Sequence, residues 1–308
     1  MTVLVGDIIT ASQYNTLSAS INKWFGDVYT GNTPASAKSQ NSYGWGNVNA
    51  GTVNTGDIIT ADQSNELINR INLGVLATGT GTSITKVVTG NPILASEHNA
   101  IETQAAIIDV NRLTTIDSTT TSGGTNGISN RSAWTSSISV VCTTTFSSYA
   151  AARYFFNTGG QLRFSFNCSG SSADALAWDD LFDADDMGSL VFSYNNIAQT
   201  GTRPGNAFAN SGFYELTTTP TEIYNINLDM SPYTSNDLRM FAYRNATGTQ
   251  VITTFTLNND DSNAETVDGT TTIYLDSRKA DPKSAAAPTV NFSVAGFSSF
   301  VAGAWTGS

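Results

Sequence analysis

GDIITADQSNELINRIN, residues Gly56–Asn72, decides how the first third of the chain folds, because similar text occurs twice more. The earlier copy, GDIITASQYNTLSASIN, spans residues 6–22 and is identical to it at 11 of 17 positions. A weaker copy, GNPILASEHNAIETQAA, spans residues 90–106 and keeps the glycine, one isoleucine, the alanine and Asn99. Such repetition indicates that one supersecondary unit is used three times.

Each copy predicts a short extended entry followed by a helix. Thr10 and Thr60 are each followed three residues later by a glutamine. In this arrangement a hydroxyl and an amide satisfy free backbone N–H groups at a helix start. Ile9 lies where it can pack against the first turn across this cap. Apolar residues then recur at helical spacing. They are Tyr14, Leu17, Ile21, Trp24, Leu67, Ile68, Ile71 and Ile101.

These apolar stripes are the predicted docking and oligomer interface. A helix of about a dozen residues is marginal alone in water. The connections between copies are long and rich in glycine, unlike those of a compact bundle. We therefore expect another copy of the chain, or the surface of a larger particle, to cover the stripes. A homo-oligomer is expected, with a trimer favoured.

The composition predicts a surface built largely from Thr, Ser, Asn and Gly. Only 13% of the 308 residues are charged, about half the usual share of roughly 25%. This composition is common in secreted adhesins and in virion proteins rich in β-structure. The net charge of −11, from 14 basic and 25 acidic residues, argues against a nucleic-acid-binding surface.

The start of the chain and its two cysteines indicate in which cellular compartment the protein is made. Met1–Gly6 has neither the basic start nor the apolar stretch of a signal peptide, and no run approaches the roughly 18 apolar residues of a membrane helix. We therefore expect synthesis in a cytosol and no membrane insertion. Cys142 and Cys168 lie in strand-like sequence and are expected to be buried thiols. A disulfide between the two cysteines is expected only if their strands are neighbours.

The spacing of apolar residues changes from helical to alternating along the chain and divides it into two regions. Residues 114–127, rich in Thr, Ser and Gly, are the predicted linker between a repeat region, 1–113, and a second domain, 128–308. Alternating segments in the second domain predict short strands, and residues 173–187 a short amphipathic insert. The predicted strands are residues 137–146, 151–157, 161–167, 190–194, 212–216, 222–228, 238–244, 251–257, 270–275 and 289–294.

Residues 151–166, AARYFFNTGGQLRFSF, are the clearest predicted hairpin, turning at the Asn-Thr-Gly-Gly stretch. The expected fold is mainly β with a smaller α part. Repeated strand/turn-helix units are followed by an antiparallel β-sandwich of jelly-roll type.

Several stretches resemble a known family. The hairpin text, GFYELTTTPTEIYNINL (212–228), FTLNNDDS (255–262) and VDGTTTIYLDSRKA (267–280) are similar to virion structural proteins of tailed bacteriophages, of the marine and cyanobacterial phage type. The GDIITADQSN repeats, with GWG before the second, resemble the leading part of the same proteins. The resemblance implies a tail, fibre, neck or capsid-decoration protein that is made in the cytoplasm of a host bacterium and located in the virion. It supplies no catalytic residues.

Candidate chemistry is sparse. His98 is the sole histidine, at a position held by Tyr and Ser in the other copies, and an ordinary packing role is predicted for it. Two acidic clusters could bind Ca²⁺ or supply the carboxylates of a glycosidase. One is WDDLFDADDMG, residues 178–188, and the other contains Asp260, Asp261, Glu265 and Asp268. Neither has EF-hand spacing, so solvated acidic loops are favoured and no cofactor is expected.

Two glycine-flanked aromatics, Tyr43 and Trp45, are candidate loop contacts that could stack on a sugar. The predicted function is therefore a phage virion component without enzymatic activity, which docks through its repeats onto other virion proteins and displays the second domain. A carbohydrate-binding protein that recognises a host surface glycan is the alternative.

Overall fold

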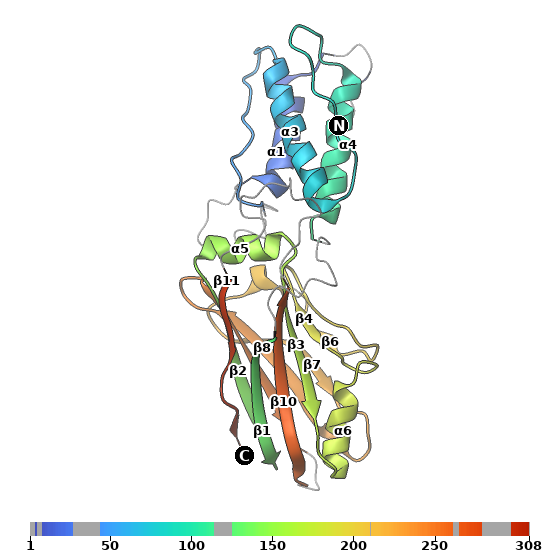
Figure 1. The fold of residues 1–308 in the computed structure, drawn as a ribbon, viewed down its shortest axis with the longest axis vertical. Helices are drawn as coiled ribbons and strands as arrows, with labels where there is room; N and C mark the ends of the chain where they lie inside the picture. Colours follow the sequence, from blue (N-terminus) through green and yellow to red (C-terminus); the bar gives the residue numbers. More distant parts are fainter. Residues whose placement is uncertain are drawn as a thin grey trace. The chain divides into compact units, whose positions relative to one another are not determined.

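The computed structural model describes residues 4, 8–26, 44–113, 125–209, 211–260, 265–278 and 297–307. The chain divides into two compact units. The helical unit contains the chain up to Asp117 together with Arg153–Gly159, and the two-sheet unit contains most of the remainder. Figure 1 shows the elements of both units.

One described helix lies in each copy of the repeat: α1 (Ala11–Phe25), α3 (Ala61–Thr78) and α4 (Ala95–Asn111). The predicted capping boxes are confirmed in the first two. The Thr10 hydroxyl accepts from the Gln13 N–H at 3.3 Å, and the Gln13 side chain accepts from the Thr10 N–H at 2.8 Å. Thr60 and Gln63 make the same two bonds. None of the described helices is long and apolar enough to cross a membrane.

The three helices begin at one end of the unit, where their entry segments line a common cavity, and they run in the same direction (Figure 1). The chain must therefore return along the unit before each new helix starts. Asparagine side chains hold the returning segments. Asn22 donates to the Ala50 carbonyl at 3.0 Å and accepts from its N–H at 2.6 Å, and Asn15 bonds Val53 in the same way at 2.9 Å.

The second copy repeats this arrangement with Asn72 on Ile84 and Asn65 on Val87. In both copies the two asparagines are seven residues apart, about 10.5 Å along a helix axis. Their partners are three residues apart, about 10 Å along an extended chain. The two spacings agree, so one helix face can bind both backbone groups of two residues on an antiparallel extended segment.

The helical unit has its own hydrophobic core, to which all three helices and the returning segments contribute. At the end away from the cavity, the ring of Trp24 lies 5.3 Å from that of Trp45 and 5.7 Å from that of Phe25. A Cβ added at Gly74 would lie 2.8 Å from the Trp24 ring, so the helices approach closely there. We refer to Trp24, Phe25 and Trp45 as the aromatic end.

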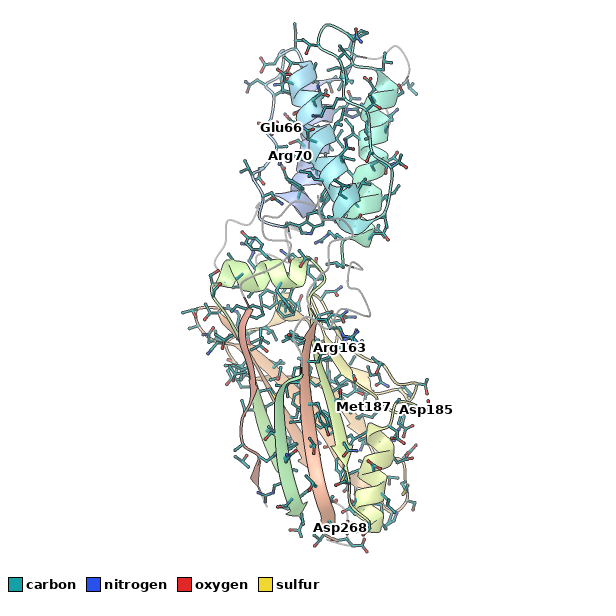
Figure 2. All side chains as sticks on the ribbon, viewed as in Figure 1. Glu66, Arg70, Arg163, Asp185, Met187 and Asp268 are labelled. Carbon is teal, nitrogen blue, oxygen red and sulfur yellow. The ribbon has the colours of Figure 1, made fainter. Side chains whose placement is uncertain are left out.

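Arg70 of α3 reaches this region from a mostly buried position. Its guanidinium lies 5.2 Å from the centre of the Phe25 ring and 2.6 Å from the Glu66 carboxylate (Figure 2). It also donates to the carbonyl of Val48 on a returning segment. The side chain thus connects a helix, an aromatic ring and the returning chain.

The two-sheet unit contains two antiparallel sheets. One has the order β1-β10-β3-β4-β5 and the other β11-β2-β9-β8-β7-β6, with β12 also paired to β2. The first consists of β1 (Thr125–Trp134), β3 (Gln161–Cys168), β4 (Leu190–Phe192), β5 (Ile197–Gln199) and β10 (Val267–Arg278). The second consists of β2 (Ile138–Phe146), β6 (Asn206–Ala207), β7 (Thr221–Asn227), β8 (Asp237–Arg244), β9 (Gln250–Asn258), β11 (Phe297–Ala302) and β12 (Thr306–Gly307).

Burial alternates along β3 and β9, as expected for strands with one face in a core. Phe164 and Phe166 of β3 meet Phe255 of β9, with ring centroids 4.7 and 5.3 Å apart, so the sheets contact each other through aromatic side chains. The predicted insert is the helix α6 (Ala173–Phe182), which packs on β3 through Phe182. The chain is mainly β with a smaller α part, as the sequence predicted.

The predicted hairpin of residues 151–166 is wrong in its first arm. Tyr149–Asn157 forms the helix α5. The Ser148 side chain accepts from the Ala151 N–H at 3.0 Å and so starts the helix. The strand β3 that follows pairs with β10 and β4 instead. Part of α5, from Arg153 to Asn157, belongs to the helical unit, although the sequence placed it in the second domain.

Other boundaries also differ from prediction. The predicted strand at 212–216 is a 3₁₀ turn, Phe213–Glu215. The strand β1 was missed, and it begins inside the predicted linker, of which residues 114–124 lie outside the described part of the chain. The predicted strand 289–294 also lies outside it.

Cys142 and Cys168 are buried free thiols. They lie on β2 and β3, which belong to different sheets, so the condition for a disulfide between neighbouring strands is not met. Burial raises the pKa of Cys142 to about 12 and raises that of Cys168 as well. Both side chains are therefore protonated and unreactive at neutral pH.

Candidate functional site

The eight apolar residues predicted as a docking interface are buried inside the helical unit. Each has at most 4% of its surface exposed, and all belong to its core cluster: Tyr14, Leu17, Ile21, Trp24, Leu67, Ile68, Ile71 and Ile101. The expectation that these stripes need an outside cover is therefore wrong. The long connections are bound along the helices by asparagine, so three short helices and two returning segments cover one another.

Of the two candidate loop aromatics, Tyr43 lies outside the described residues. Trp45 is fully buried in the aromatic end. Its face is taken by Trp24 and Phe25, so it is not available for stacking on a sugar in this structure.

A cavity of about 870 Å³ lies at the opposite end of the helical unit. Its lining comes from all three repeats, from the segment before each helix and, in the first two copies, from the first residues of the helix. These stretches are residues 8–12, 55–59 with Ala61, and 89–93. We refer to this region as the open end.

Equivalent positions of the three copies have equivalent exposure at the open end. Ile8 and Ile58 are each 86% exposed. Pro92 holds the same place in the third copy and is exposed too. The next residue in each copy, an isoleucine, is half-buried, and Ile59 and Ile93 pack against the core of the unit. The three exposed residues, Ile8, Ile58 and Pro92, thus form an apolar rim of the cavity. The half-buried isoleucines form an apolar wall, which packs against the core at Ile59 and Ile93.

The polar groups near the open end are largely satisfied by the protein. The N–H groups of Gln13 and Gln63 bind the capping threonine hydroxyls. Asp57 is the one charged side chain among the described residues of the lining, and its carboxylate accepts from the Asn54 N–H at 2.9 Å. The Tyr14 hydroxyl donates to the Gln63 carbonyl at 3.2 Å and ties α1 to the first turn of α3.

The sequence contained a signal for the open end that our prediction did not use. Each of the first two copies has two consecutive isoleucines before the helix, whereas the stripe needs only one of them. In the structure the second isoleucine of each pair is half-buried and the first is exposed. An exposed apolar residue that recurs at the equivalent position of two copies is a candidate contact residue.

The predicted calcium cluster does not gather in the described structure. Asp261 lies outside the described residues. The Asp268 carboxylate accepts from the Ser172 N–H at 2.7 Å and from the N–H and hydroxyl of Ser171 at 2.7 and 2.9 Å. These bonds, led by the Ser172 N–H, lower the pKa of Asp268 to about 2. Its oxygens are used to hold the start of α6.

The two other described members of that cluster bind different residues from those that Asp268 binds. Glu265 accepts from the Tyr233 hydroxyl at 2.7 Å. The backbone N–H of Asp260 donates to the Asn236 side chain at 2.8 Å. These residues therefore act as local connections between loops.

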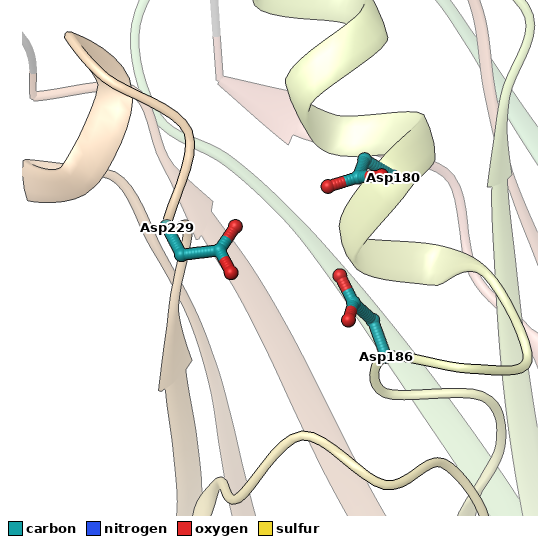
Figure 3. A group of neighbouring side chains, drawn as sticks. All are labelled: Asp180, Asp186 and Asp229. Carbon is teal, nitrogen blue, oxygen red and sulfur yellow. The ribbon is translucent and has the colours of Figure 1, made fainter.

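A second acidic group lies beside α6. Oxygen atoms of Asp180, Asp186 and Asp229 lie within 4.8 Å of one another, and the three side chains point toward one another (Figure 3). The Arg203 guanidinium lies 3.1 Å from Asp229 and 3.6 Å from Asp186. Burial raises the pKa of Asp186, and Arg203 opposes that shift. Arg203 pairs with two of the three carboxylates and offsets part of their charge, so we describe the group as an ion-pair cluster and assign no metal to it.

His98 is 5% exposed and lies in the first turn of α4. Burial lowers its pKa, so it is neutral at pH 7. Its place among the buried residues of the helix agrees with the predicted packing role.

No protein family model, curated protein or solved structure matches this chain.

Proposed function

We propose that this protein is a structural component of a tailed-phage virion and that it attaches to the particle through the open end of its helical unit. The observation that carries the proposal is the exposure of Ile8 and Ile58, at equivalent positions of two repeats, beside a cavity whose lining is more apolar than polar. Contiguous exposed apolar surface on a folded protein marks an interaction site.

The energetics favour a contact at this place. Burying one exposed isoleucine contributes about 1.5–3 kcal/mol, and the open end offers two of them with Pro92 beside them. Asp57 is the single charged side chain among the described lining residues, so little desolvation of charge opposes burial. This proposal therefore assigns docking to the segments that precede the helices, instead of to the buried apolar stripes.

The resemblance to virion structural proteins and the low charge content support the same function. In this proposal the two sheets form a β-sandwich of jelly-roll type that is displayed outward, and the chain assembles as a homo-oligomer, with a trimer favoured. Structural attachment without catalysis is proposed.

Particles of the phage that encodes the chain provide the test. Mass spectrometry of density-purified particles should recover the protein at a fixed ratio to the major capsid protein. The double variant Ile8→Ser/Ile58→Ser should be folded but lost from the particles. Val48→Ser/Val110→Ser is the matched control, because these valines are 83% and 76% exposed in the same unit and lie outside the cavity.

Absence of the protein from wild-type particles would refute the virion assignment. Normal incorporation of the isoleucine variant would refute docking through the open end. Binding of the purified chain to a glycan array, together with absence from particles, would favour the carbohydrate-binding alternative.

A further inference from the structure

We infer that the cavity at the open end receives an uncharged apolar peptide segment from another virion protein. This inference rests on the proposed function and names the chemistry of the partner. Three features of the open end carry it: the small area of the rim, the volume of the cavity, and the polarity of the lining.

The rim is too small to hold a second copy of the chain face to face. A fully buried aliphatic side chain removes on the order of 100 Å² from water. Ile8, Ile58 and Pro92 together therefore offer about 300 Å². A stable interface needs roughly 800 Å² from each partner. Contact through the rim alone falls well short of that area.

A peptide segment inserted into the cavity buries more area than contact with the rim alone. The cavity volume of about 870 Å³ falls in the range of roughly 300–1,000 Å³ that encloses most of a ligand's surface. A segment inside it contacts the walls as well as the rim. The walls include Ile59 and Ile93, which are supported by the core behind them. The site is thus already formed before the partner arrives, which lowers the entropy cost of binding.

The lining also indicates what kind of segment fits. Among its described residues there is no Lys or Arg, and the carboxylate of Asp57 is bound to the Asn54 N–H. A charged side chain would enter without an opposite charge, at high cost. A peptide backbone must still bond its own N–H and C=O groups. The side chains of Thr55, Thr89 and Asn91 in the lining can bond them.

The first measurement uses the purified full chain and the uncharged apolar dye Nile red. The wild-type protein should bind the dye with saturable fluorescence enhancement. Ile8→Ser/Ile58→Ser should weaken the affinity at least tenfold, and Val48→Ser/Val110→Ser should leave it unchanged. Absence of saturable binding, or equal affinity in all three proteins, would overturn the inference. Far-UV circular dichroism of each variant checks that the helices are intact.

The second measurement identifies the occupant in particles. Ile58→p-benzoylphenylalanine places a photo-crosslinker at the rim, and the same substitution at Val48 is the control. Irradiation should join position 58, and not position 48, to a different virion protein through an uncharged apolar segment, which tryptic mass spectrometry identifies. A crosslink to a second copy of this chain, or to a charged segment, would overturn the inference.

The two measurements in particles separate the peptide-receiving role from the virion assignment. If the protein is present in particles but position 58 gives no crosslink, the peptide-receiving role is wrong and the virion assignment remains. If the protein is absent from particles, both are wrong.

Discussion

The helical unit and the two-sheet unit satisfy their extended backbone in different ways. In the two-sheet unit, strands such as β3 and β10 bond each other's backbone from residue to residue. In the helical unit, the returning segments are bound by side chains of the helices, at Asn15 and Asn22 in the first copy. An asparagine has one donor and one acceptor group, so it can replace a strand neighbour for one residue.

This difference gives a structural meaning to the asparagines of the repeat. They allow three parallel helices to form a core without short connections, because each long connection becomes part of the packed unit. The same arrangement leaves the entries together at one end, with apolar side chains that the core does not use. The open end is thus a consequence of running all three helices in one direction.

The largest effect is expected at the aromatic end. Trp24→Ala removes a fully buried ring that contacts Trp45 and Phe25. It should destabilise the helical unit by about 3–5 kcal/mol, as for other large-to-small core substitutions. Urea unfolding followed at 222 nm measures the helical transition, with the exposed Val110→Ala as control. An unchanged midpoint would mean that the unit does not depend on its aromatic core.

A smaller loss is expected when one asparagine is removed. Asn72→Ala leaves the N–H and carbonyl of Ile84 without their helix partner, which should cost about 1–3 kcal/mol. Hydrogen exchange at the Ile84 amide should become faster than in the wild type. Thr16→Ala is the control, because the Thr16 hydroxyl donates to the Ser12 carbonyl of its own helix at 2.8 Å. Unchanged exchange at Ile84 would contradict the role of asparagine.

The two units should also differ in their response to acid. Asp268 in the two-sheet unit binds the N–H groups of Ser171 and Ser172, and its pKa is lowered to about 2 from an ordinary value of 3.8. A lowered folded-state pKa stabilises the fold above pH 4, and this contribution is lost as the pH falls through about 2. The asparagines that bind the returning segments of the helical unit do not titrate.

NMR titration of the Asp268 side chain measures this directly. Below pH 4 the unfolding midpoint of the two-sheet unit should fall in the wild type and change less in Asp268→Asn. An Asp268 pKa near 4 would remove the proposed difference between the units.

The smallest effect on stability is expected at the open end. Ile8→Ser and Ile58→Ser alter side chains that are 86% exposed, so the free energy of unfolding should change by no more than about 0.5 kcal/mol for each. Thermal unfolding of the double variant checks this. A large loss of stability would show that these isoleucines belong to the core and would weaken their assignment to docking.

Local chemistry allowed the helix starts to be predicted. The bonds of Thr10 to Gln13 and of Thr60 to Gln63 span three residues, and they form wherever a helix begins with that pair. The alternating pattern likewise predicted β3, β8 and β9, because one face of each strand is buried. The helix α5 was missed because its apolar residues also suit a strand, and a cap from Ser148 together with contacts in the folded chain decided between the two.

The helix starts and the alternating strands could be predicted from the sequence, because each depends on residues only a few positions apart. The repeat and the low charge content are read directly from the sequence. The tertiary structure was needed to show that the stripe residues, from Tyr14 to Ile101, cover one another, and that Ile9 and Ile59 are half-buried while Ile8 and Ile58 are exposed. Those outcomes depend on the common direction of three helices and on asparagine bonds that join residues 12 to 38 positions apart. No local pattern contains that information.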